Sequence, residues 1–268
     1  MTSGQDDDAG WSELYEAPAR LEMSFAHERL FAPQAYPVPR RAQRVPIVHV
    51  EALAMAAWFP VCWERRRNGP RLCVLRSLLK DAERAQPAGS PRNPASLPLA
   101  LRSYPVAITP ELGAGGAILV DRVVADRPGD VGAPFIMADG KPSRGLLHRY
   151  RTAMIVRHAA ARADEITRAL AEADAFRTWS LVFELGPRTT IAINDLLYVP
   201  PEAMEDGAVR DLLARFGMEA AVLLSAHRMS LFRINALLQA ARKAAGSAAE
   251  AAATDEENDD VRTPSLIG

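Results

Sequence analysis

An apolar repeat between Pro142 and Phe176 constrains the fold of this chain more than any other feature. Its apolar side chains recur three or four residues apart, as they do on one face of an α-helix. The repeat comprises Leu146, Leu147, Tyr150, Met154, Ile155, Ile166 and Leu170. Ser143 stands just before it, where a hydroxyl can cap the first turn. The pattern predicts one long central helix.

Short apolar runs on either side of this helix predict antiparallel hairpins. The runs are rich in β-branched and aromatic residues, and turn residues separate them. We expect pairing of Val61–Trp63 with Leu72–Leu79 and of Trp179–Leu185 with Thr189–Ile193.

Two further helices are expected near the C-terminal end, at Glu202–Phe216 and Met218–Ala241. Gly217 separates them, because glycine readily adopts the conformation that ends a helix. These elements together predict an α+β fold. Its small antiparallel sheets, built from hairpins, pack with a long central helix and a C-terminal helix pair.

Changes in composition along the chain predict three parts. Residues 1–44 carry scattered apolar anchors and are expected to form a weakly ordered arm. Residues 45–242 form a single α+β domain, which the Pro-rich loop or insertion 81–98 interrupts. Residues 243–268 are rich in Ala, Glu and Asp and lack large apolar side chains until Leu266, so a disordered acidic tail is expected.

Charge and hydropathy exclude several classes of protein. The formal net charge is −1, so no global basic field favours nucleic acid or an anionic membrane. No run approaches the roughly 20 apolar residues that cross a bilayer. The longest candidate, Val45–Trp63, is interrupted by Pro46, Glu51 and Pro60. Residues 1–10 lack the basic and apolar regions of a secretory signal, and we expect a soluble cytoplasmic protein.

Cys62 and Cys73 flank the turn of the first predicted hairpin. If Asn68 and Gly69 alone form the turn, Cys62 faces Leu75 and the two thiols are not paired. We expect two buried free thiols. A disulfide or a metal pair is the alternative, although no further cysteine and no histidine at ligand spacing supports it.

Five residues are candidates for ligand binding: Arg102, Tyr104, Asp139, Lys141 and His227. Arg102 lies in an apolar segment before Tyr104, so its charge must reach water, a carboxylate or a ligand anion. Asp139 and Lys141 flank a glycine, which suits either a tight turn or a binding loop. His227 lies on the last predicted helix and shares a face with Ser230, either in helix packing or at a site.

No complete catalytic or cofactor motif accompanies these residues. The chain contains no phosphate-binding loop, no histidine pair at metal-ligand spacing and no nucleophile elbow. We therefore assign no catalytic residue, no metal and no cofactor. Basic clusters at Arg40, Arg41 and Arg44 and at 65–67 suit a solvated surface, with nucleic-acid contact as an alternative.

Four blocks of the chain resemble the SapC-like family of bacterial proteins. The blocks are 45–63, 97–106, 134–143 and 226–231. The first contains Val45-Pro46-Ile47 and Trp58-Phe59-Pro60, the second contains Arg102 and Tyr104-Pro105, and the last contains His227. Their order and spacing agree with the family across residues 45–240. An Asn-Leu-Phe and Gly-x-Trp stretch typical of the family is absent, and the Pro-rich segment Asp81–Ser96 stands in its place.

The resemblance implies an association with bacterial surface layers or with nutrient uptake rather than a reaction. Some members of the family are labelled permeases, but the missing membrane spans argue against that label here. We expect a non-catalytic binding or accessory protein with an unknown protein or small-molecule partner. The alternatives are an enzyme with a pocket near Arg102, Asp139 and His227, which requires that these residues converge, and a nucleic-acid regulator.

Overall fold

The computed structural model describes residues 11, 13–85, 94–109, 112–113, 118–186 and 189–260, with side chains to residue 248. Its largest sheet has five antiparallel strands in the order β3-β5-β4-β9-β8. The strands are β3 (Arg44–Pro46), β4 (Val61–Arg66), β5 (Gly69–Leu75), β8 (Arg177–Gly186) and β9 (Thr189–Tyr198). Both predicted hairpins are thus confirmed and join in one sheet, although Pro187 and Arg188 of the second turn lie outside the described residues.

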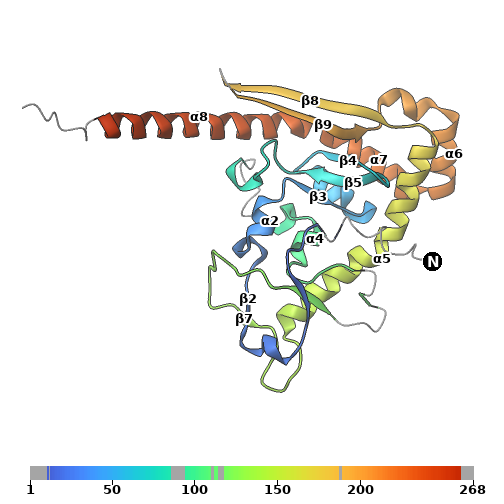
Figure 1. The fold of residues 1–268 in the computed structure, drawn as a ribbon. Helices are drawn as coiled ribbons and strands as arrows, with labels where there is room; N and C mark the ends of the chain where they lie inside the picture. The colour runs from blue at the N-terminus through green and yellow to red at the C-terminus, as the bar shows by residue number, and fades with distance from the viewer. Residues whose placement is uncertain are drawn as a thin grey trace, which may run out of the picture.

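Two smaller antiparallel sheets lie near the N-terminal end of the long helix (Figure 1). They pair segments of the arm with the middle of the chain. One joins β1 (Pro18–Arg20) to β6 (Leu119–Asp121), and the other joins β2 (Arg29–Leu30) to β7 (Ala133–Pro134). The described helices together with these sheets confirm the predicted α+β class.

The long helix α5 (Arg144–Glu172) crosses the molecule beneath the large sheet (Figure 1). The Ser143 hydroxyl caps it as predicted, accepting a hydrogen bond from the Leu146 amide at 3.2 Å. Its apolar face is buried from Leu146 through Val156 to Leu170. Near its C-terminal end, Thr167 Oγ1 accepts a hydrogen bond from Trp63 Nε1 of β4 at 3.1 Å. This contact connects the helix directly to the sheet.

The remaining helices are all shorter than α5, and α8 is the longest of them. They are α2 (Pro37–Arg41), α3 (Ala52–Ala56), α4 (Leu99–Arg102), α6 (Gly207–Phe216), α7 (Met218–Ser230) and α8 (Ile234–Asp260). Single 3-10 turns lie at Met23–His27, Pro33–Ala35, His49–Glu51, Ala82–Arg84, Pro94–Ser96, Pro201–Glu205 and Leu231–Arg233. Gly217 separates α6 from α7 at a φ of 57°, as the sequence predicted.

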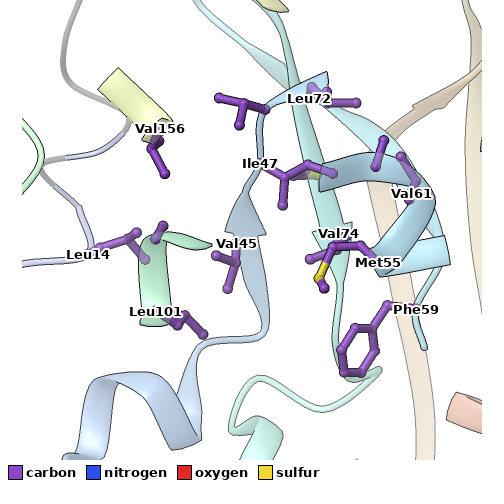
Figure 2. Packing of buried hydrophobic residues seen from close by; sticks show 14 of the residues in the cluster. Leu14, Val45, Ile47, Met55, Phe59, Val61, Leu72, Val74, Leu101 and Val156 are labelled. Carbon is purple, nitrogen blue, oxygen red and sulfur yellow. The ribbon is translucent and has the colours of Figure 1, made fainter. Parts of the chain in front are cut away.

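One hydrophobic core joins the arm to the rest of the molecule. Figure 2 shows Leu14 of the arm beside Leu101 of α4, Val45 of β3 and Val156 of α5. Phe25 and Tyr36, also in the arm, are buried. The apolar anchors that are scattered along the described part of the arm thus all reach this core.

The β4–β5 hairpin corrects the predicted pairing of the two cysteines. Cys62 lies directly opposite Cys73, and Arg66 lies opposite Gly69. A two-residue Asn-Gly turn of the expected kind needs a positive φ at both residues. Only Gly69 has one, at 113°, so the turn residues are Arg67 and Asn68 and the register moves by two.

The last predicted helix also differs from the structure. It is divided into α7 and α8 by the 3-10 turn Leu231–Arg233. Helix α8 then continues to Asp260, into the segment expected to be a disordered tail. In Figure 1 it runs along the β8–β9 hairpin and extends beyond it. Residues 261–268 lie outside the described residues.

Candidate functional site

Arg102 and Tyr104 lie close in sequence but in different surroundings. The Arg102 side chain is exposed at the end of α4 and forms no ion pair with any described residue. Tyr104 is fully buried, and its hydroxyl donates a hydrogen bond to Asp121 Oδ2 at 2.7 Å. Burial and the Asp121 carboxylate raise the pKa of Tyr104. Asp121 also accepts the Glu16 and Ala17 amides, so this buried pair holds the arm against β6.

Asp139 and Lys141 form an exposed turn before α5. Asp139 Oδ1 accepts the Lys141 amide at 3.1 Å, and the two side chains form an ion pair at 3.3 Å. Gly140 between them has a φ of 79°, which suits glycine. The hydrogen bond and the backbone conformation are those of a tight turn.

His227 lies in the core, where it connects β4 to the residue that follows β9. Its Nδ1 donates a hydrogen bond to the Val61 carbonyl at 2.6 Å, and its Nε2 accepts one from the Val199 amide at 3.1 Å. This bonding requires the neutral ring with its proton on Nδ1. Burial lowers the pKa of His227 to about 4. Ser230, its predicted neighbour on the helix, donates to the His227 carbonyl and accepts the Val61 amide.

The structure does not bring Arg102, Asp139 and His227 together. Asp139 precedes the start of α5, whereas His227 packs against Trp63, which bonds to Thr167 near the other end. At about 1.5 Å per residue, the helix rises about 36 Å between Ser143 and Thr167. A single pocket lined by both Asp139 and His227 is therefore not formed.

A cavity of about 320 Å³ lies on the outer part of the large sheet, where residues 13–16 and α2 of the arm meet β3, β4 and β5. We call it the arm cavity. The sequence did not predict it. Its charged lining consists of Arg41, Arg44, Arg66, Arg71 and Lys80 against Glu13, Glu16 and Glu64. Five cations against three carboxylates leave a formal excess of two positive charges. Leu14, Pro37, Val38, Ala42, Pro46 and Cys73 contribute apolar surface.

A network of ion pairs crosses the wall of the arm cavity. Glu64 bonds to Arg44 at 2.6 Å and to Arg66 at 2.7 Å. Arg44 also reaches Asp195 at 2.5 Å. The two nitrogens of the Arg66 fork bond to the two oxygens of Glu13 at 2.5 and 2.6 Å. Hydrogen bonding to Arg66 lowers the pKa of Glu13, so the arm is attached to the sheet by a charged pair.

Arg71 is the exception in this network. Its side chain is half-buried, forms no ion pair with a described residue, and has a buried Nε without a hydrogen-bond partner. Burial lowers its pKa, and the nearby Arg66 charge acts in the same direction. A guanidinium in this setting is a group that can receive an anion.

A second cavity of about 320 Å³ opens beside β4 and β8 and is lined by Arg65, Asp174 and Arg177, among others. Its arginines have partners within the chain. Arg65 donates to Thr178 at 2.7 Å, and Arg177 donates to the Asp174 carbonyl at 2.8 Å. The arm cavity is therefore the stronger candidate for a ligand site.

No cluster of three or more His, Cys, Asp or Glu side chains in the described part of the chain could hold a metal ion. None of the helices described is long and apolar enough to cross a membrane.

Fold and site together define an α+β protein with a charged cavity over the edge of its sheet. A family model described as SapC matches residues 23–237, which is more than half of the chain. The chain belongs to the SapC family, as its four sequence blocks indicated. No curated protein and no solved structure matches it.

Proposed function

We propose that this chain is a non-catalytic binding protein whose ligand occupies the arm cavity, and that it serves as an accessory to a cell-surface or nutrient-uptake system. The observation that carries the binding role is a cavity of about 320 Å³ with a guanidinium on its wall, that of Arg71, which forms no ion pair with a described residue. Its volume lies within the range of roughly 300–1,000 Å³ that small-molecule sites occupy. The accessory role is supported by the family resemblance.

The hydrogen bonds of His227 and Tyr104 favour a structural role over a catalytic role for these two candidates. Both ring nitrogens are bonded to backbone groups, which leaves neither free to exchange a proton with a substrate. The Tyr104 hydroxyl is likewise bonded to Asp121 in the core. Both side chains hold the fold together.

The test is an NMR titration of the uniformly labelled full chain with small anionic, neutral and cationic compounds. We expect amide shifts to concentrate at residues that line the arm cavity. Ala42→Trp should fill the cavity and abolish these shifts, because Ala42 is part of its wall. Ala192→Trp, at an exposed position of β9, is the matched control and should keep them.

Circular dichroism of both variants checks that the fold is retained. Shifts that persist in a folded Ala42→Trp variant would place the ligand elsewhere. If no compound of any charge class shifts residues of the cavity, the proposed function is wrong.

A further inference from the structure

Three arginines surround one carboxylate on the wall of the arm cavity. Glu64 is buried, with 8% of its surface exposed, and Arg71 lies directly opposite it in the register of β4 and β5. That position would normally give a cross-strand ion pair. The two Glu64 oxygens are occupied instead, Oε1 by Arg44 at 2.6 Å and Oε2 by Arg66 at 2.7 Å.

The other described carboxylates near the cavity form no ion pair with Arg71. Both oxygens of Glu13 bond to Arg66 at 2.5 and 2.6 Å, and Asp195 bonds to Arg44 at 2.5 Å. Glu16 lines the cavity but forms no ion pair with any described residue. Arg71 is thus left with a cationic neighbour on the same wall, and no carboxylate of the described residues is bonded to it.

An unpaired, partly buried guanidinium is unfavourable, because its N–H groups lose water without gaining acceptors. An oxyanion resolves this directly. The planar fork of arginine matches two oxygens of a carboxylate or a phosphate and bonds them with two parallel N–H donors. Lys80, which lines the same cavity, adds positive charge without competing for the fork.

Resting on the proposed binding function, we propose that the ligand of the arm cavity is a small molecule with a carboxylate or phosphate group, and that Arg71 binds this group. The apolar wall formed by Leu14, Val38 and Pro46 receives the rest of the molecule. The pKa of Arg71, lowered by burial, is consistent with a cation that lacks its anion.

The experiment titrates the full chain with inorganic phosphate and, separately, with acetate, at low ionic strength to limit screening. Amide shifts at β5 and in the arm report binding. We expect Arg71→Gln to weaken the binding of both anions by about tenfold or more, as the loss of one charge-assisted pair implies. Arg65→Gln makes the same charge change outside the arm cavity and should leave affinity within about twofold.

Two further variants separate anion binding from general charge. Arg71→Lys keeps the charge but loses the fork, so its affinity should fall between those of the wild type and Arg71→Gln. Glu13→Gln removes a neighbouring negative charge and should tighten binding. A difference between phosphate and acetate affinity identifies which oxyanion the site prefers.

Unchanged anion affinity in a folded Arg71→Gln variant would overturn the inference. So would a wild-type cavity that responds to neutral or cationic compounds but to neither anion, and in that case the proposed binding function survives. A cavity that responds to no compound of any class defeats both proposals.

Discussion

Single polar side chains connect distant elements of this protein through backbone groups. His227 of α7 bonds to the Val61 carbonyl on β4 and to the Val199 amide just after β9. Arg149 of α5 is buried and donates to the carbonyls of Arg102, Tyr104 and Phe31, which connects the helix to α4 and to the arm. Burial lowers its pKa to about 10. These two side chains hold neighbouring elements in position.

The pH dependence of stability should carry the signature of His227. In the unfolded chain it binds a proton below about pH 6.5, but in the folded chain only below about pH 4. Its contribution is therefore complete above pH 6.5 and is lost as the pH falls from 6.5 to 4. The loss should reach about 3 kcal/mol in the free energy of unfolding. Urea denaturation of the wild type and of His227→Asn across this range measures the difference.

Glu51 makes the comparison with a variant necessary. Burial raises the pKa of Glu51 to about 7, so its charged form is disfavoured in the fold. Its effect has the opposite sign, because stability falls as the pH rises from 4.5 to 7. The two effects overlap in the wild type. Subtracting the unfolding free energy of His227→Asn from that of the wild type at each pH removes the Glu51 effect and leaves that of His227. A difference between wild type and His227→Asn that does not vary with pH would contradict the assignment.

At the scale of elements, the register of the β4–β5 hairpin sets which residue lies opposite each cysteine and which charged residues face each other on the cavity wall. The turn at Arg67 and Asn68 places Cys62 opposite Cys73 and Glu64 opposite Arg71. The two sulfurs are 3.8 Å apart, and both cysteines are free and buried. The predicted free thiols are confirmed, although the predicted register was wrong.

We expect neither thiol to react with Ellman's reagent in the native protein. Each thiol is at most 1% exposed, and the hydrogen bond to the Cys73 thiol together with burial raises the pKa of Cys62. Thiolate is the reactive form, so both accessibility and ionisation oppose the reaction. In denaturant both thiols become accessible, so two equivalents of thiol per chain should react with the reagent. Arg65→Cys at an exposed strand position is the positive control, and rapid native labelling of Cys62 or Cys73 would contradict the packing.

At the scale of the whole molecule, one core extends from the arm to the first turns of α8. Leu14 and Phe25 of the arm and Leu237 and Ala241 of α8 are all buried in it. Residues of the arm thus share one core with residues of the predicted domain 45–242. The family match, from residue 23 to residue 237, likewise includes part of the arm.

Truncation distinguishes the two parts of α8. Residues 249–268 contain no large apolar residue before Leu266, so a chain that ends at residue 248 should melt within about 2 °C of the full chain. A chain that ends at residue 235 also loses buried Leu237 and Ala241 and should melt about 8 °C lower or more. Thermal denaturation followed by circular dichroism measures both. A large effect of the shorter deletion would show that the distal segment stabilises the fold.

The elements were predictable because their signals are local. The apolar period of α5, its Ser143 cap and the glycine between α6 and α7 all appear within a few residues of sequence. The candidate site was less predictable. Arg102, Asp139 and His227 are notable in sequence, yet the structure places them in three separate environments. The predicted register of the first hairpin was wrong, because Asn-Gly suits more than one turn type.

The sequence by itself determined the α+β class, both hairpins, the long helix and the SapC family, since periodicity, turn residues and ordered motifs are written along the chain. Only the tertiary structure decided the arm cavity and its charges. Arg44 meets Glu64 across 20 residues of sequence and Asp195 across 151. Competition among three arginines for Glu64 depends on strand register and on the arm's return to the sheet. Such pairings have no local signal in the sequence, so only the folded structure shows that Arg71 forms no ion pair with a described residue.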